Sequence, residues 1–126
     1  MYRCFAIAAT VLCLHAPSLA QVQRLFPPDA LRGEIVVQAP PAVLLNGNEA
    51  RLAPGARIRG EDNLLKMSTT LIGSRLTVNY TIDTYGLVRD VWILRPEEVR
   101  KRPWPRTMAE ARAWQFNPTE QSWSKP

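Results

Sequence analysis

The stretch that decides the fold spans residues 76–94 and reads LTVNYTIDTYGLVRDVWIL. In residues 76–82 apolar and polar side chains alternate, which predicts a strand with one buried face. Thr84-Tyr85-Gly86 then forms the turn of a hairpin, because glycine accepts the left-handed conformation that such turns need. Residues 87–94 form the returning strand.

The returning strand has a problem of side-chain parity. Val88 points to one face of a regular strand, whereas Val91 and Ile93 point to the other. A β-bulge near Arg89-Asp90 would realign them, since a bulge inserts one unpaired residue. The alternative is a strand that is covered on both faces.

A second hairpin is predicted around Asn46-Gly47, which lies between the apolar residues 43–45 and residues 48–52. Asn-Gly favours a type I′ turn, in which both central residues have positive φ. The β-branched residues 34–38 predict a further strand before it.

Pro54-Gly55 fits the centre of a type II turn. The strand predicted after it, residues 56–59, places Arg57 and Arg59 on one face. Residues 60–63 predict another turn, and residues 64–67 fit either a strand or one helical turn.

The composition changes beyond Pro96. Thr107 and Glu110 have the spacing of a capping box, which predicts a short helix that Asn117-Pro118 ends. Three of the four tryptophans lie in this segment, so we expect it to be docked on the sheet: Trp104, Trp114 and Trp123. The predicted fold is mainly β, a small antiparallel β-roll or sandwich of about six strands with one short C-terminal helix.

Residues 1–20 have the pattern of a cleavable signal peptide. A positive charge at Arg3 precedes an apolar run of about eleven residues. Small residues then stand at the positions that a signal peptidase recognises, with cleavage expected after Ala20. The run is shorter than the roughly 20 residues of a membrane-spanning helix, although a retained anchor is the alternative. The prediction is a periplasmic or secreted product, residues 21–126, that forms a single domain without an integral membrane segment.

Cleavage would remove both cysteines and the only histidine, Cys4, Cys13 and His15. The remaining chain then lacks the most frequent general base, the thiol nucleophile and the usual zinc ligands. We therefore predict no cofactor and no metal, and no enzymatic activity.

The remaining chain has 15 basic and 11 acidic residues, with arginine far more frequent than lysine. Arginine suits carboxylate and phosphate groups, although the same balance is typical of an ordinary solvated surface.

One enzymatic alternative remains, a small carboxylate-dependent hydrolase of envelope glycans. Asp83 and Asp90 flank one hairpin and would be its pair of carboxylates. In the competing interpretation Asp83 stabilises the turn and Asp90 lies at the bulge.

The favoured hypothesis is a non-catalytic interaction module of the cell envelope that binds a protein or an anionic component. An exposed sheet edge would accept a partner's backbone. The candidate binding residues are Arg57, Arg59, Trp104 and Arg106, of residue types that suit anions or are enriched at binding hot spots. Trp104 is equally well explained as a core residue. Export makes nucleic acid an unexpected partner, and the oligomeric state stays open.

Two resemblances support export and binding. Residues 24–94, with RLFPPDALRG, LAPGARIRG and VWIL, resemble a group of small uncharacterised exported proteobacterial proteins. Residues 73–118 are similar in layout to the TonB C-terminal domain: an alternating strand, a turn at Gly86, a second strand, and a helix followed by WQFNP. The second resemblance implies a module that binds at a sheet edge.

Overall fold

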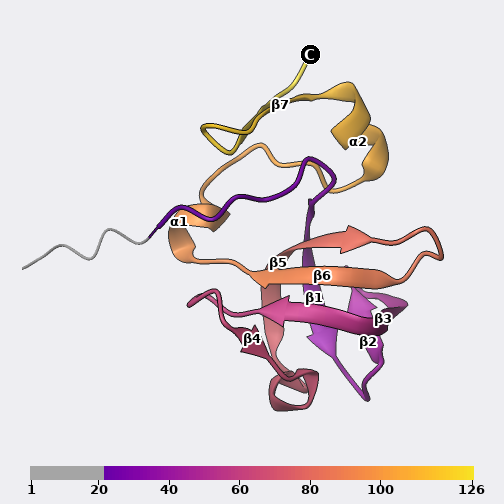
Figure 1. Cartoon of the computed structure of the whole chain (residues 1–126). Coiled ribbons are helices and arrows are strands. Elements are labelled where there is room, and N and C mark those ends of the chain that lie inside the picture. The colour runs from indigo at the N-terminus through magenta and orange to yellow at the C-terminus, as the bar shows by residue number, and fades with distance from the viewer. Residues whose placement is uncertain (1–21) are drawn as a thin grey trace, which may run out of the picture.

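The computed structural model describes residues 22–126 (Figure 1), so the predicted signal peptide lies outside the described residues. The strands are β1 (Leu31–Val37), β2 (Ala42–Leu45), β3 (Asn48–Arg59), β4 (Leu65–Lys66), β5 (Arg75–Ile82), β6 (Val88–Ile93), β7 (Gln115–Asn117) and β8 (Ser122–Ser124). The helical elements are the 3-10 turn η1 (Ser68–Leu71) and the short helices α1 (Pro96–Val99) and α2 (Met108–Ala113).

Six strands form one sheet in the order β2-β1-β5-β6-β3-β4, and β2 also pairs with β3. This extra pairing closes five of the strands into a barrel, with β4 attached to β3. The prediction of a mainly β fold with about six strands and a short helix is confirmed. The roll or sandwich is wrong because the sheet closes on itself, and the sheet is not wholly antiparallel because β3 and β6 run parallel.

The barrel closes through β3, which is 12 residues long. The turn predicted at Pro54-Gly55 is wrong, since both residues lie inside this strand. Gly55 has a φ of +75°, and the register of β3 against β6 shifts between Leu52 and Arg57. The irregularity falls where β3 passes from its partner β2 to its partner β6. A bulge at this place bends the strand, and that curvature is what a closed barrel needs.

Both predicted hairpins are present. Asn46 and Gly47 have φ angles of +53° and +81°, as a type I′ turn requires, and join β2 to β3. Gly86 has a φ of +78° in the turn between β5 and β6.

The bulge predicted near Arg89-Asp90 is also confirmed. Tyr80 pairs with Val91 and Ile82 pairs with Val88, so β6 has one residue more than β5 between these two pairs. The extra residue turns Val88 and Val91 into the same core, while Trp92 is buried on the opposite face.

The protein has two hydrophobic clusters. The barrel interior is built mainly from aliphatic side chains: Leu31, Ile35, Val37, Val43, Leu52, Ile58, Val78, Tyr80, Val88 and Val91. An aromatic cluster lies between the barrel and residues 96–126, which are called the C-terminal segment below. It contains Phe26, Ala30, Trp92, Leu94, Trp104 and Trp123. Figure 1 shows this segment, in orange to yellow, packed above the barrel on the side of β5 and β6.

The half-buried pattern predicted for residues 76–82 fails at two positions. Asn79 and Thr81, which alternate with the core residues, are fully buried. The Asn79 carbonyl oxygen accepts a hydrogen bond from Arg32, and the Thr81 hydroxyl exchanges hydrogen bonds with Asp90 at the bulge. The Asn79 oxygen and the Thr81 hydroxyl thus each have a partner on a neighbouring strand, whereas Asn79 Nδ2 has none among the described residues.

The C-terminal segment docks as predicted, but its local structure differs. Thr107 caps α2 by accepting from the Glu110 amide at 3.2 Å. The helix ends at Ala113 rather than at the predicted Asn117-Pro118, because Trp114 already has extended backbone angles. The chain then forms the hairpin β7–β8, which the sequence analysis did not predict. No helix within residues 22–126 has the length and apolar character needed to span a membrane.

The Asn46-Gly47 turn makes a direct test of the barrel. A Cβ atom at Gly47 would meet nothing within 4 Å, so substitution there strains the backbone alone. We expect Gly47→Val to lower the free energy of unfolding by about 1–2 kcal/mol, the cost of left-handed backbone. The control Gly47→Asn should lose less, since asparagine tolerates this region. Urea denaturation measures both, and an unchanged curve for the valine variant would contradict the turn.

Candidate functional site

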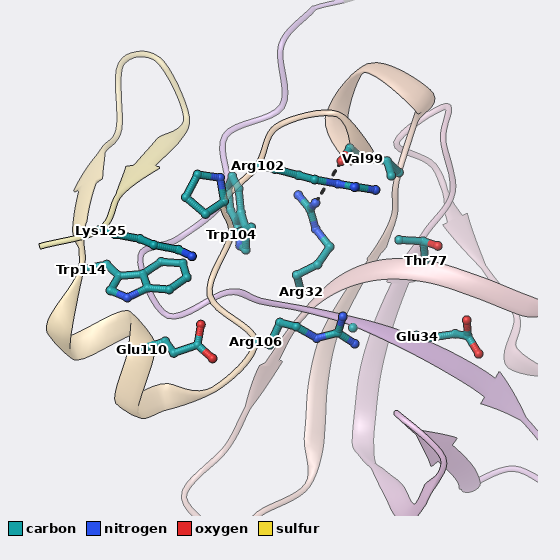
Figure 2. Close-up of a pocket in the computed structure, with 12 residues that line it drawn as sticks. Arg32, Glu34, Thr77, Val99, Arg102, Trp104, Arg106, Glu110, Trp114 and Lys125 are labelled. Atoms are coloured by element: carbon teal, nitrogen blue, oxygen red, sulfur yellow. Dashed lines mark hydrogen bonds between the residues drawn. The ribbon is translucent and has the colours of Figure 1, made fainter.

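A groove of about 500 Å³ runs between the barrel and the C-terminal segment (Figure 2). The barrel contributes Arg32, Gly33 and Glu34 of β1 and Thr77 of β5. The C-terminal segment contributes Val99, Arg102, Pro103, Trp104, Arg106, Glu110, Trp114 and Lys125. Its volume is within the range of small-molecule sites in proteins.

Arg32 projects from β1 toward the C-terminal segment and is only 8% exposed. Its Nε donates to Asn79 Oδ1 at 2.9 Å. Its Nη atoms donate to the backbone carbonyls of Glu98, Val99 and Lys101 at 3.2–3.4 Å. These partners are all neutral, so no carboxylate of residues 22–126 is in direct contact with this buried guanidinium.

The indole ring of Trp104 supports the Arg32 guanidinium. The guanidinium carbon lies 5.0 Å from the centre of the indole ring, in cation–π contact. The ring is 5% exposed, and its N–H donates to the Ala30 carbonyl at 3.0 Å. It also makes edge contacts with Phe26 and Trp123. Trp104 is therefore a core residue that borders the groove, in agreement with the alternative interpretation of this position.

Two further guanidinium groups act on Arg32. Burial lowers the pKa of Arg32 most, the positive charges of Arg102 and Arg106 also lower it, and Glu98 opposes them; together these effects bring the pKa to about 10. Arg102 and Arg106 are both exposed. The three side chains thus share one positive field at the groove, which favours an anion there.

The wall opposite Arg32 has a different character. It carries Glu110 of α2, the partly buried Trp114, and Lys125, whose ammonium lies 5.2 Å from the Trp114 ring centre. Figure 2 shows these three side chains on one side and Glu34 and Thr77 on the other, with Arg32 and Arg106 between them. The ion pairs found in residues 22–126 are Arg24–Glu98, Lys66–Asp62 and Arg89–Asp90, and none of their members lines the groove.

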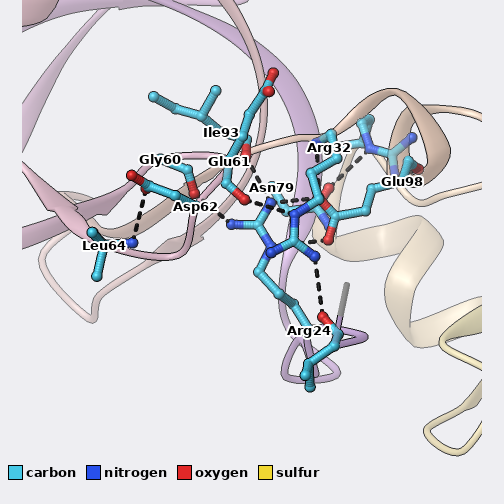
Figure 3. Close-up of polar contacts among 11 residues, drawn as sticks. Arg24, Arg32, Gly60, Glu61, Asp62, Leu64, Asn79, Ile93 and Glu98 are labelled. Carbon is cyan, nitrogen blue, oxygen red and sulfur yellow. Dashed lines mark hydrogen bonds and ion pairs between the residues drawn. The ribbon is translucent and has the colours of Figure 1, made fainter. Parts of the chain in front are cut away.

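A buried ion pair holds the backbone that Arg32 contacts (Figure 3). Arg24 pairs with the Glu98 carboxylate and also donates to the carbonyls of Gly60 and Ile93 at 2.9 and 2.7 Å. Glu98 accepts in addition from the Arg95 amide at 2.8 Å. The Glu98 carboxylate is thus engaged by Arg24, while its backbone carbonyl takes a hydrogen bond from Arg32.

The structure brings together only part of the predicted binding set. Arg106 lies in the groove and Trp104 borders it from the core. Arg57 is exposed on β3, and Arg59 lines a separate hollow with Asp62 and Arg95. Arg57 and Arg59 do not line this groove.

The two carboxylates of the hydrolase hypothesis both have structural partners. Asp83 Oδ1 accepts from the amides of Tyr85 and Leu87 at 2.8 and 2.9 Å and so closes the turn. Asp90 Oδ2 accepts from Thr81 at 3.3 Å and Arg89 at 3.2 Å. Neither aspartate lines the groove. These are the roles that the competing interpretation assigned to them.

Within residues 22–126, no three acidic side chains are grouped so that they could hold a metal ion. Comparison with protein-family models, with curated proteins and with solved structures finds no match. The candidate site therefore rests on its own geometry.

Sequence reasoning missed the residues that matter most in the groove. Arg32 stands in a strand next to Leu31 and Gly33, where nothing local indicates that its side chain is buried. Arg102 is not among the predicted binding residues, and Trp114 is predicted only as one of the three tryptophans that dock the C-terminal segment. The one available signal was the combination of several tryptophans and arginines in residues 102–114.

The Arg24–Glu98 pair supplies a test of what supports Arg32. Burial disfavours the charge of Glu98, but hydrogen bonds from Arg24 and the Arg95 amide, with the charges of both arginines, hold its pKa below the usual 4.5. Glu98→Gln leaves Arg24 buried without a counter-charge, so we expect a loss of about 3–5 kcal/mol at pH 7.

The pH dependence has a definite sign. A carboxyl group whose pKa is lower in the folded state stabilises the protein above its unfolded value and loses this effect as the pH falls through the folded value. The difference between wild type and Glu98→Gln should therefore shrink below pH 4.5. Chemical denaturation at pH 7 and pH 3 measures it, with Glu97→Gln, a change at the exposed neighbouring residue, as control. If both variants unfold alike at pH 7, the pair does not support α1.

Proposed function

We propose that this protein is a non-catalytic binding module of the cell envelope that holds an anionic component in the groove beside β1. Arg32, Arg102 and Arg106 are its binding residues. The observation that carries the proposal is the buried Arg32. Its hydrogen-bond partners among the described residues are neutral, and its pKa is lowered by burial and by the two neighbouring guanidinium groups.

Electrostatics supports an anion as the ligand. Burying a charge without a counter-charge is costly, and three cations in one field repel one another. An oxyanion in the groove would offset both costs, and its hydrogen bonds to guanidinium groups are of the strong, charge-assisted kind.

The closed barrel supports a groove rather than a sheet edge as the binding surface. Each of the five barrel strands has a strand partner on either side over at least part of its length. Among the strands of residues 22–126, the two-residue β4 and the three-residue β7 and β8 have a partner on one side alone. Binding by strand addition, as the resemblance to the TonB C-terminal domain implies, would use one of these short edges. The groove offers a larger and more specific set of side chains.

Titration with sulfate at constant ionic strength tests the anion site. We expect saturable shifts of the arginine Nε–H signals in NMR spectra of the wild type. In the double variant Arg102→Gln/Arg106→Gln the affinity should fall at least tenfold, because two of the three charges are removed.

Arg57→Gln is the matched control, since it removes an exposed arginine that does not line the groove. It should bind sulfate as the wild type does. A linear response without saturation, equal in all three proteins, would show only general screening and would rule out the site.

Export is the second part of the proposal and has its own test. Expressed in a Gram-negative host, the protein should be recovered from the periplasm or the medium with the mass of residues 21–126, because signal peptidase cleaves after small residues such as Ala20. Intact-mass spectrometry measures this. Recovery of the full-length chain from the membrane fraction would overturn the assigned compartment.

A further inference from the structure

The two walls of the groove narrow the class of anion that it can hold. On one side lie the guanidinium groups of Arg32, Arg102 and Arg106. On the other lie a carboxylate, Glu110, an indole, Trp114, and the ammonium of Lys125 against that indole. A site for a densely charged polymer would be expected to present cations without carboxylates among them, and this groove carries Glu110 and Glu34 as well.

The carboxylates disfavour a ligand with closely spaced charges. Glu110 and the exposed Glu34 both line the groove, and neither forms an ion pair within the described residues 22–126. Each would repel a chain of phosphates that extended from the arginines. A carboxylate does, however, accept hydrogen bonds from hydroxyl groups. Glu110 and Glu34 therefore suit a ligand that places hydroxyls beside its anionic group.

Trp114 offers an apolar surface beside these polar groups. Its side chain is partly buried, and Lys125, near the C-terminus, lies against its ring. Such an exposed cation–π contact stabilises by only about 0.5–1 kcal/mol, so a ligand can replace the lysine at small cost. The electron-rich face of an indole attracts the weakly positive C–H groups of a ring that lies on it.

We propose that the groove binds a carboxylate-bearing saccharide. The carboxylate lies among Arg32, Arg102 and Arg106, a sugar ring packs on Trp114, and hydroxyl groups donate to Glu110 and Glu34. This assignment rests on the proposed function, since it names the ligand class of the same anion site. A ligand of this class carries anionic groups that are separated from one another by hydroxyl-rich sugar rings.

Isothermal titration calorimetry with four probes of three repeating units each tests the assignment. Trigalacturonate is the acidic saccharide, maltotriose the neutral one, tripolyphosphate the dense anion, and triglutamate the acidic peptide. We expect the wild type to bind trigalacturonate at least tenfold more tightly than each of the other three.

Three variants separate the contributions, with Arg112→Gln on the exposed face of α2 as control. Arg106→Gln should weaken the binding of trigalacturonate about tenfold, and Glu110→Gln and Trp114→Leu should each weaken it severalfold. Glu110→Gln should strengthen the binding of tripolyphosphate, because it removes a repelling charge. Thermal melting of each variant checks that it is folded, and Glu110→Gln, at a partly exposed side chain, keeps the test valid if Trp114→Leu unfolds.

The failures are distinguishable. If tripolyphosphate or triglutamate binds most tightly, or if Glu110→Gln leaves the affinity for trigalacturonate unchanged, the saccharide is wrong although the anion site stands. If the wild type binds neither these anions nor sulfate, both the saccharide and the proposed function are wrong.

Discussion

The buried guanidinium of Arg32 is the interaction on which both the fold and the site depend. It bonds to Asn79 of the barrel strand β5 and to carbonyls around α1, so one side chain ties the sheet to the C-terminal segment. The carbonyls are in place because Glu98, which holds α1, is paired with Arg24. Two buried arginines thus serve different ends. Arg24 is paired with a carboxylate and acts structurally. Arg32 contacts neutral groups, so its positive charge contributes to the electrostatic potential in the groove.

The local elements could be predicted because their causes are local. Asn46-Gly47 requires positive φ whatever surrounds it, and the parity of Val88 and Val91 requires an extra residue between them. Closure of the barrel could not be predicted in this way. It depends on the parallel pairing of β3 with β6, two strands separated by almost 30 residues, and on the choice of Pro54-Gly55 to bend a strand rather than to end it. The same dipeptide serves either role, and only the distant partner decides.

The candidate site shows the same division. Residue type alone placed Arg106 and Trp104 near a functional surface, but it could not separate the tryptophan that fills the core from the arginine that faces solvent. Arg57 and Arg59 were selected because alternation places them on one face of β3, and they do share a strand. What alternation cannot tell is where that face lies relative to the C-terminal segment. Arg32 was missed for the converse reason, since burial of an arginine depends on partners far away in the chain.

Closing the barrel also changes how such a small domain can bind. An open sheet exposes backbone groups along its edges, and strand addition is then the simplest mode of recognition. Here the long strands are paired on both sides, so recognition is left to side chains at the junction of the barrel and the C-terminal segment. The groove lies at that junction. Arg32 is buried there against the barrel and still lines the groove. The aromatic cluster holds Trp104 on several sides, through its hydrogen bond to Ala30 and its edge contacts with Phe26 and Trp123. Arg32 stacks on this packed ring, so its guanidinium is oriented by contacts within the protein and a bound anion need not organise it.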